Sequence, residues 1–296
     1  MITIILFIFG LAVGSFLNVV SLRYDPESGR SVFSRLPIGG RSRCPSCRQT
    51  LAWYDLIPIF SFLFLRGKCR YCGAKIAWQY PIIEIISGFA ALLPLYFYGQ
   101  YSVAALTSAG ENVWPLWIFI AVWTLALYIF ILLSVIDWRF TIIPDELNVA
   151  IGILGIIKIA SFYFYDKFSF NLGTFLDGYA QLFGFRENIL TNHAVAAAFG
   201  ILFFGTIIYV TRGRGMGMGD LKLAAALGLL LGWPDILVAI LLSFMLGASY
   251  SIFKIVFGGL HLKDAVPFGP FIVLGVIVTL FWGADILRAY FTLFNF

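Results

Sequence analysis

The sequence contains few charged residues for its length. Only 12% of its 296 residues are Asp, Glu, Lys or Arg, whereas a soluble domain carries about 25%. Hydrophobic residues make up 61% of the chain, above the roughly 45–50% of soluble domains. No soluble core would bury so many apolar side chains. A globular cytosolic enzyme, a disordered chain and a secreted disulfide scaffold are therefore excluded.

Several common catalytic and cofactor signatures are also missing. The two histidines, His193 and His261, are not part of an H-E-x-x-H motif. They lie at the ends of apolar segments, and we interpret both as interfacial. The chain has no G-x-S-x-G nucleophile motif and no G-x-G-x-x-G cofactor fingerprint. These absences leave no competing catalytic set beside the carboxylates described below.

Long apolar runs are abundant instead. Roughly 20 apolar residues in a helix cross a hydrocarbon core of about 30 Å. Seven segments approach this length: Ile2–Val20, Pro81–Tyr98, Trp114–Ile136, Leu147–Phe164, Ala194–Val210, Ile236–Phe257 and Phe268–Leu287. An eighth, Leu221–Leu231, is short for a span. Because the runs are continuous rather than alternating, the sequence predicts an all-α polytopic membrane protein with about eight transmembrane helices, surrounded by lipid.

The distribution of charge predicts the orientation. The chain between Arg23 and Lys75 holds ten Arg or Lys residues and three acids. Basic loops between apolar segments are typically retained in the cytoplasm, so we prefer this explanation to nucleic-acid binding. No basic residue precedes Arg23 and no cleavage site follows the first apolar run, so we expect a retained helix with its N-terminus outside.

All four cysteines lie in this basic loop, as C-P-S-C and, after 21 intervening residues, C-R-Y-C. A cytoplasmic loop is reducing, which favours metal binding over disulfides. Two such pairs complete a tetrahedral site with no open position, which is typical of a structural metal. The sequence predicts zinc bound by Cys44, Cys47, Cys69 and Cys72. The alternative is four unligated or redox-active thiols.

Three aspartates lie at the ends of apolar segments. Asp137 follows an apolar run in I-D-W-R-F-T-I-I-P-D, and Asp220 lies in M-G-M-G-D-L-K-L. Ionised residues near bilayer depth are costly and are functional candidates by default. The alternative is a helix cap, which we favour for Asp145. Gly217 and Gly219 would let a peptide approach Asp220 closely. Two neighbouring carboxylates share a proton and can together hydrolyse a peptide bond.

Several motifs, in this order, resemble the bacterial type IV prepilin peptidase family. They are G-S-F-L-N-V-V (Gly14–Val20), the cysteine pairs, W-Y-D-L-I-P-I-F-S-F (Trp53–Phe62), Y-P-I-I-E (Tyr80–Glu84), I-D…I-P-D and M-G-M-G-D-L-K-L. The resemblance implies a multi-pass enzyme of the bacterial inner membrane with active sites facing the cytoplasm. It implies that Asp137 and Asp220, with Asp145 as runner-up, cleave the basic leader from prepilins and pseudopilins of type IV pili or type II secretion.

The resemblance also implies a second activity, N-methylation of the new terminal amine with S-adenosylmethionine as methyl donor. Glu84, an acid near the zinc loop, is the candidate for the methyl-transfer site. The alternative is a helix-start glutamate favoured by the helix dipole. The implied organisation is a first transmembrane helix (1–20), a zinc loop of the methyltransferase part (21–79), a second transmembrane helix with an outer loop (80–113) and an aspartic peptidase domain (114–296).

Three other functions stay open at this point. A presenilin-like G-x-G-D intramembrane protease would use the same two aspartates but gives the zinc loop no role. A transporter would use Asp137 and Asp220 as ion ligands, but the chain has no internal repeat. A non-enzymatic zinc scaffold for pilus or secretion assembly would survive the loss of both aspartates. Residues 161–192 exceed the family's usual connection, and we interpret them as a tolerated outer insertion rather than a partner site.

Overall fold

In the computed structural model, the described residues are 1–28, 32, 41–93, 95–96, 114–165, 174–176, 188–258 and 264–293. Within these ranges the chain is helical and has no β-strand, which confirms the all-α prediction. His261 and most of the 161–192 segment lie outside the described residues. The chain divides into two compact parts, residues 1–99 with 123–132, and residues 100–122 with 133–296. Each part is described by itself.

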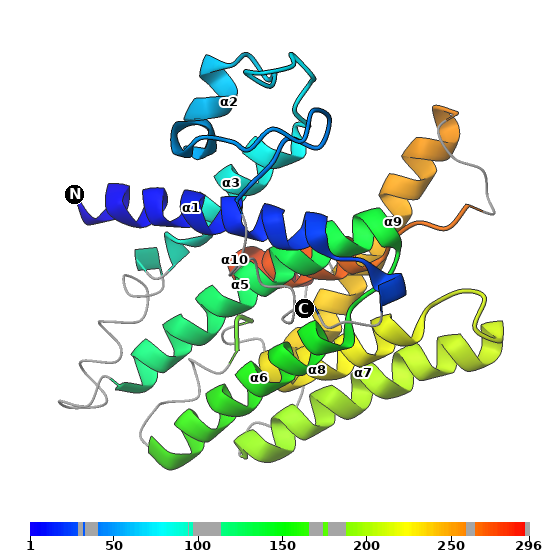
Figure 1. Cartoon of the computed structure of the whole chain (residues 1–296). Helices are drawn as coiled ribbons and strands as arrows, with labels where there is room; N and C mark the ends of the chain where they lie inside the picture. Colours follow the sequence, from blue (N-terminus) through cyan, green and yellow to red (C-terminus); the bar gives the residue numbers. More distant parts are fainter. Residues whose placement is uncertain are drawn as a thin grey trace. The chain divides into compact units, whose positions relative to one another are not determined.

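The first part is built on two helices packed side by side. Its elements are α1 (Ile2–Arg23), η1 (Pro26–Ser28), η3 (Trp53–Leu56), α2 (Phe60–Phe64) and α3 (Gln79–Ala90) (Figure 1). Two glycines of α1 allow the close packing of α1 and α3. A Cβ atom on Gly10 would lie 2.4 Å from the Ser87 carbonyl oxygen, and one on Gly14 would lie 2.7 Å from the Glu84 Cα. Small residues four positions apart let helix backbones approach in a membrane.

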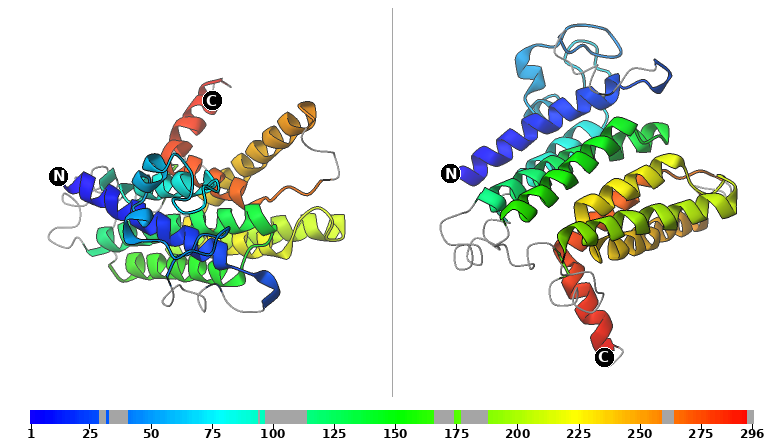
Figure 2. Two further views of the ribbon diagram at one scale, coloured as in Figure 1. Left: turned by 45° about the horizontal axis from the view of Figure 1, so that its top comes forward. Right: turned by 90° about the horizontal axis from the view of Figure 1, so that it is seen from below.

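In the second part, a short helix packs against two longer ones. The helices are α6 (Asp145–Tyr165), α7 (Ile189–Thr211), α8 (Met218–Leu231), α9 (Asp235–Val256) and α10 (Gly269–Leu293). Helix α8 packs against both α6 and α7, and α9 pairs with α10 (Figures 1 and 2). A Cβ atom on Gly228 would lie 2.5 Å from the Ala197 nitrogen, and one on Gly155 would lie 2.7 Å from the Leu229 carbonyl carbon. Helix α8 therefore meets backbone on two sides.

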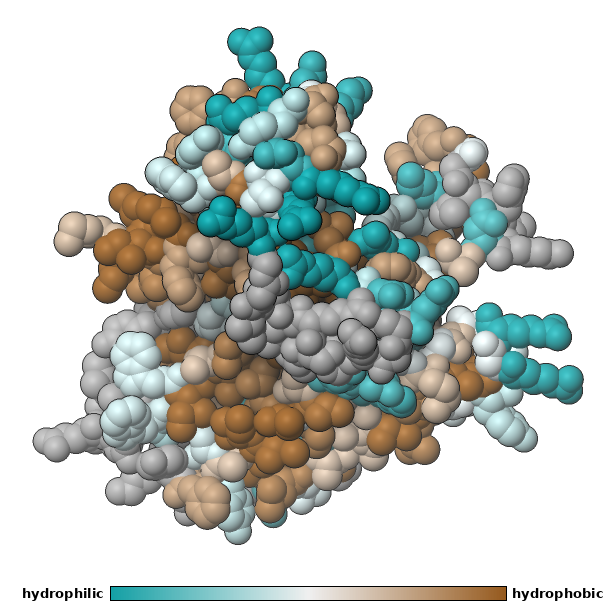
Figure 3. All heavy atoms as spheres, in the orientation of Figure 1, coloured by the Kyte–Doolittle hydropathy of each residue, from teal (hydrophilic) through white to brown (hydrophobic). Residues whose placement is uncertain are grey.

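Six described helices are long and apolar enough to cross a membrane: α1, α5 (Trp114–Phe140), α6, α7, α9 and α10. Large apolar side chains of α1, including Ile2, Ile4 and Ile5, are exposed. On the face drawn in Figure 3, hydrophobic side chains cover the long helices and hydrophilic ones gather over the cysteine loop. These observations confirm a multi-pass membrane protein, because such apolar surface needs lipid contact.

The predicted number of eight spans is not confirmed. Helix α8 has 14 residues and α3 has 12, so neither is long enough to cross a bilayer alone. Helix α3 ends at Ala90, within the predicted segment Pro81–Tyr98.

Two sequence expectations are corrected in the second part. Helix α5 continues through Asp137 to Phe140, so this aspartate lies within a helix rather than after it. His193, interpreted as interfacial, is only 2% exposed inside the second part. In both cases the helix extends beyond the predicted apolar run.

Candidate functional site: a cysteine cluster and a carboxylate pair

The four cysteines of the first part lie on two tight turns with matching geometry. The Arg48 N–H donates to the Cys44 carbonyl at 2.9 Å. The Gly73 N–H donates to the Cys69 carbonyl at the same distance, 2.9 Å. Both donors follow the second cysteine of their pair, and both have a positive φ, 58° for Arg48 and 70° for Gly73. The two turns therefore present their thiols in the same way.

The thiols converge on one point. All four sulfur atoms lie within 4.8 Å of one another, and Cys44 Sγ is 3.9 Å from Cys72 Sγ. Four sulfurs around zinc at about 2.3 Å would lie about 3.8 Å apart. The Cys47 backbone N–H hydrogen-bonds to the Cys44 thiol and lowers its pKa to about 6, which favours the thiolate that a metal needs. The arrangement fits a four-cysteine metal site.

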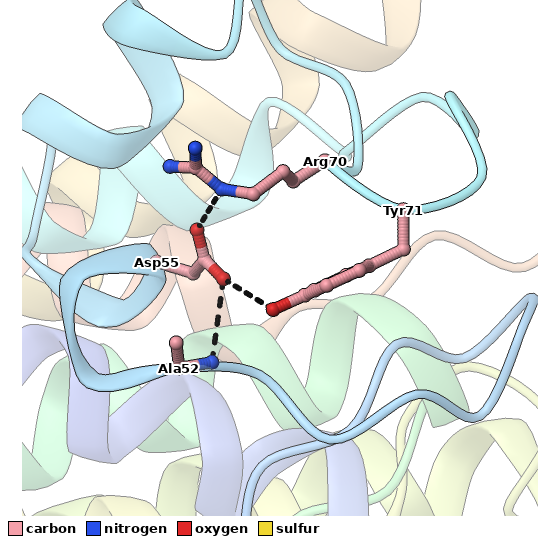
Figure 4. A network of polar contacts seen from close by, with 4 residues as sticks. All are labelled: Ala52, Asp55, Arg70 and Tyr71. Carbon is pink, nitrogen blue, oxygen red and sulfur yellow. Dashed lines mark hydrogen bonds and ion pairs between the residues drawn. The ribbon is translucent and has the colours of Figure 1, made fainter.

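Asp55 joins the second cysteine turn to the η3 turn, as Figure 4 shows. Its carboxylate accepts hydrogen bonds from Arg70 Nε at 2.7 Å and from Tyr71 Oη at 3.4 Å. It also accepts from the Ala52 N–H at 3.3 Å. The Asp55 side chain is only 2% exposed. Arg70 and Tyr71 stand between the cysteines of C-R-Y-C, so Asp55 holds this turn in place. Its spacing in the sequence carries no signal for this role.

Glu84 connects α3 to the cysteine loop. Its Oε2 accepts a hydrogen bond from the Ile59 N–H at 2.8 Å, and the residue is 6% exposed. Ile59 has a φ of 62°, which is rare for a β-branched residue, so this bond stabilises a strained turn. Helix α3 begins at Gln79 and has no acid in its first turn. The helix-dipole explanation for Glu84 is therefore wrong.

Asp137 is held by the first residue of α10. Its side chain is buried, and its Oδ2 accepts a hydrogen bond from the Gly269 N–H at 2.8 Å. Partial positive charge at a helix N-terminus stabilises an anion there. A Cβ atom on Gly269 would lie 2.7 Å from this oxygen, so the contact requires glycine. Pro270 follows in the sequence, and proline early in a helix was the available signal for this terminus.

Asp220 is the third residue of α8 and lies near Asp137. Its Oδ2 accepts a hydrogen bond from the Gly217 N–H at 3.1 Å, so Asp220 also caps its own helix. Asp137 and Asp220 lie close enough to interact electrostatically. A Cβ atom on Gly219 would lie 3.2 Å from Ile143 Cβ, which brings the segment before α6 against the start of α8. Asp137 thus lies within electrostatic range of Asp220, although the two carboxylates are distant in sequence.

Asp145 has a different partner. It is the first residue of α6, and Lys222 Nζ donates to its two carboxylate oxygens at 2.8 and 2.7 Å. Lys222 lies two residues after Asp220 on α8. Asp145 is therefore near the carboxylate pair but engaged in an ion pair. No sequence pattern singled out Lys222.

Two family models and several curated proteins match this chain. Residues 8–98 match the bacterial peptidase A24 N-terminal domain, and residues 124–252 match the type IV leader peptidase family. A prepilin leader peptidase/N-methyltransferase of Aeromonas hydrophila is 32% identical over 98% of this chain and 94% of its own length. The protein of that name from Bacillus subtilis (strain 168) is 32% identical over 97% and 96%. One from Pseudomonas aeruginosa is 30% identical over 95% and 90%.

The fold and the matched residues define a helical, multi-pass membrane protein related to membrane peptidases. More specifically, the chain belongs to the type IV leader peptidase family. This confirms the resemblance drawn from the motifs between Gly14 and Leu231. No solved structure matches the chain significantly.

Proposed function

We propose that this protein removes the leader peptide from type IV prepilins and pseudopilins and then N-methylates the new terminus. The observation that carries the peptidase activity is the Asp137–Asp220 pair, in which Asp137 is fixed by the Gly269 N–H at the start of α10. Family membership supports this activity, because the relatives carry the name prepilin leader peptidase/N-methyltransferase. A presenilin-like protease would have no use for the four-cysteine cluster.

The two carboxylates perform acid–base chemistry on a peptide bond. Like charges at short range do not both ionise, so the pair carries one shared proton. The ionised carboxylate takes a proton from a water molecule, whose oxygen then attacks the scissile carbonyl carbon. The protonated carboxylate donates its proton to the carbonyl oxygen. When the C–N bond breaks, the carboxylate that took the proton from water passes it to the leaving amine nitrogen, and the collapsing gem-diol returns a proton to the other carboxylate. Asp145 is the less suitable partner, because Lys222 holds both of its oxygens.

The substrate chemistry fits an interfacial site. A prepilin has a basic leader followed by an apolar helix, so its cleavage site lies where cytoplasm meets membrane. The basic loop between Arg23 and Lys75 supports an orientation with that face in the cytoplasm of a bacterium and the helices in its inner membrane. Pseudopilins of type II secretion also have a basic leader followed by an apolar helix.

The cysteine cluster and Glu84 belong to the methyltransferase half. The Sγ atoms of Cys44, Cys47, Cys69 and Cys72 would hold a structural zinc ion, which would stabilise a loop with little apolar core. S-adenosylmethionine supplies the methyl group as an electrophilic sulfonium. Glu84 is a buried acid between α3 and the loop, where a carboxylate suits a sulfonium or an ammonium group. Its hydrogen bond to the Ile59 N–H keeps the carboxylate oriented.

A peptide assay tests the peptidase half. Detergent-purified protein is incubated with a prepilin-like peptide and S-adenosylmethionine, and the products are identified by mass spectrometry. We expect the wild type to remove the leader and to add one methyl group, whereas Asp137→Asn and Asp220→Asn leave the peptide intact. Asp285→Asn is the matched control, because Asp285 forms only an exposed ion pair with Arg288 on α10.

The aspartate variants have outcomes that contradict the proposal. Each variant must first match the wild type in thermal unfolding, since Asp→Asn changes little volume. Cleavage retained in folded Asp137→Asn or Asp220→Asn would remove that residue from the pair. Complete loss in Asp145→Asn combined with cleavage in Asp137→Asn would transfer the role to Asp145.

A further inference from the structure

Helix α8 carries Asp220 but is too short to cross a bilayer. Its 14 residues give a length of about 21 Å, against a hydrocarbon core of about 30 Å. At least one end of α8 therefore lies inside the apolar layer. The last carbonyl groups of a helix have no partner within it, and at this depth the protein itself must supply one.

The C-terminal end of α8 has such partners. Lys158 Nζ, from α6, donates to the carbonyls of Leu230 at 2.9 Å and Leu231 at 3.4 Å. The Lys158 side chain is completely buried. From α7, the buried His193 ring lies against the turn, so that a Cβ atom on Gly232 would come within 2.9 Å of the ring. A buried lysine is expensive unless it is paired, which makes this contact a specific feature.

An acid next to this turn balances the lysine charge. Asp235, the first residue of α9, is fully buried and interacts electrostatically with Lys158. Its carboxylate accepts hydrogen bonds from Thr174 Oγ1 at 2.6 Å and from the Phe175 N–H at 2.9 Å. The described residues 174–176 of the long connection thus pack on this polar cluster. This part of the connection has a structural role in the second part.

The same helix, α6, also holds the other end of α8. Asp145, at the start of α6, forms the ion pair with Lys222 near the N-terminus of α8, with an N–O distance of 2.7 Å. Between the two ends, Gly155 of α6 lets the backbone of Leu229 approach. Helix α6 therefore contacts α8 through one polar side chain at each end.

We propose that Lys158 is a positioning residue that fixes the axial register of α8 against α6, and with it the place of Asp220 relative to Asp137. The Asp145–Lys222 pair is exposed and adds little to this restraint. This inference rests on the proposed catalytic pair. A slip of one helical turn would move Asp220 by about 5.4 Å, which exceeds hydrogen-bond reach.

On the α7 side, the contact between Gly228 and the Ala197 backbone opposes such a slip. On the α6 side, the hydrogen bonds from Lys158 Nζ to the Leu230 and Leu231 carbonyls oppose it.

Disulfide cross-linking in the full-length protein measures the register without using activity. A Cβ atom built on Gly152 of α6 lies 4.0 Å from the Ala226 Cβ of α8, within the range of about 3.5–4.5 Å for a disulfide. The pair Gly152→Cys/Ala226→Cys therefore reports the native register. The pair Gly152→Cys/Leu230→Cys, one turn further along α8, reports a slip. Mass spectrometry of peptides distinguishes these bonds from those of the four native cysteines.

The register is then measured after loss of the lysine. Lys158→Met keeps the length of the side chain but removes the donor and the charge. The double variant Lys158→Met/Asp235→Asn also removes the lysine donor and charge, but it leaves no unpaired buried carboxylate. It replaces the single variant in the measurement if Lys158→Met does not fold. Lys254→Met on α9 is the matched control, since Lys254 lies over the Tyr250 ring and not at α8.

We expect Lys158→Met and the double variant to form the 152–226 bond at least five-fold more slowly than the wild type and to gain the 152–230 bond. In the same variants without added cysteines, kcat for leader removal falls about ten-fold with KM unchanged. Unchanged cross-linking in folded protein overturns the inference, whether or not kcat falls. A wild type that cross-links as described but cleaves no prepilin peptide contradicts the proposed function and not the register.

Discussion

Replacing Gly269 by alanine tests how far one backbone hydrogen bond supports the carboxylate pair. The added Cβ atom would lie 2.7 Å from Asp137 Oδ2 and 3.1 Å from Leu133 Cδ2. The first distance is shorter than any ordinary contact of this kind. Either the carboxylate or the start of α10 must therefore move, and the 2.8 Å hydrogen bond from the Gly269 N–H lengthens or breaks.

The size of the effect follows from the bond that is lost. A hydrogen bond to a charged group contributes about 1.5–3 kcal/mol. If this bond stabilises the transition state, its loss raises the activation free energy by the same amount. Each 1.4 kcal/mol lowers the rate tenfold, so kcat/KM falls by roughly 10- to 150-fold. The assay is the initial rate of leader removal from a prepilin-like peptide, measured by mass spectrometry beside a thermal unfolding curve for each protein.

Gly152→Ala is the control for the alanine substitution. The nearest heavy atom to its new Cβ is that of Ala226 at 4.0 Å, so the methyl group fits. Alanine inside a helix is favoured over glycine by about 0.5–1 kcal/mol, and we expect unchanged cleavage with equal or higher thermal stability. Wild-type cleavage by folded Gly269→Ala would refute the assigned role of the Gly269 N–H.

Further predictions concern the cysteine loop. Cys44→Ser should lower the zinc content, measured by elemental analysis, and reduce methylation more than cleavage; undiminished zinc would contradict the site. Gly73→Ala should destabilise the loop by about 1 kcal/mol, because Gly73 has a φ of 70° that disfavours alanine; proteolysis of the loop measures this. Arg48→Gly, at the matching position with a φ of 58°, should slow that proteolysis instead, and equal effects of the two changes would count against the strain argument. Glu84→Gln should reduce methylation with cleavage retained, as product masses report; full methylation would exclude Glu84 from that reaction.

The features of this protein that could be predicted from the sequence are those that depend on local sequence patterns. Apolar runs predicted α1, α5, α6, α7, α9 and α10, because crossing a bilayer requires a long apolar helix whatever its neighbours are. The cysteine cluster was predictable from two short spacings, because cysteines three positions apart within one turn lie near each other. The motifs around Asp137 and Asp220 marked both carboxylates, which the fold places within electrostatic reach.

The sequence was less informative about polar partners inside the second part. No sequence pattern indicated a role for Lys158, and His193 was expected at the interface. Only packing revealed that both are buried at the C-terminal end of α8. The same holds for Asp55, whose partners Arg70 and Tyr71 lie in a different turn.

The sequence by itself determined which helices are long and apolar enough to cross a membrane, which loop carries the thiols and which carboxylates lie at the ends of apolar segments. Those features depend on composition and on short spacings. The tertiary structure alone decided that Gly269 donates to Asp137, that Lys222 engages Asp145 and that Lys158 completes the end of α8. These contacts join helices that are far apart along the chain, so the packing of one backbone against another sets them. No local propensity specifies such a contact.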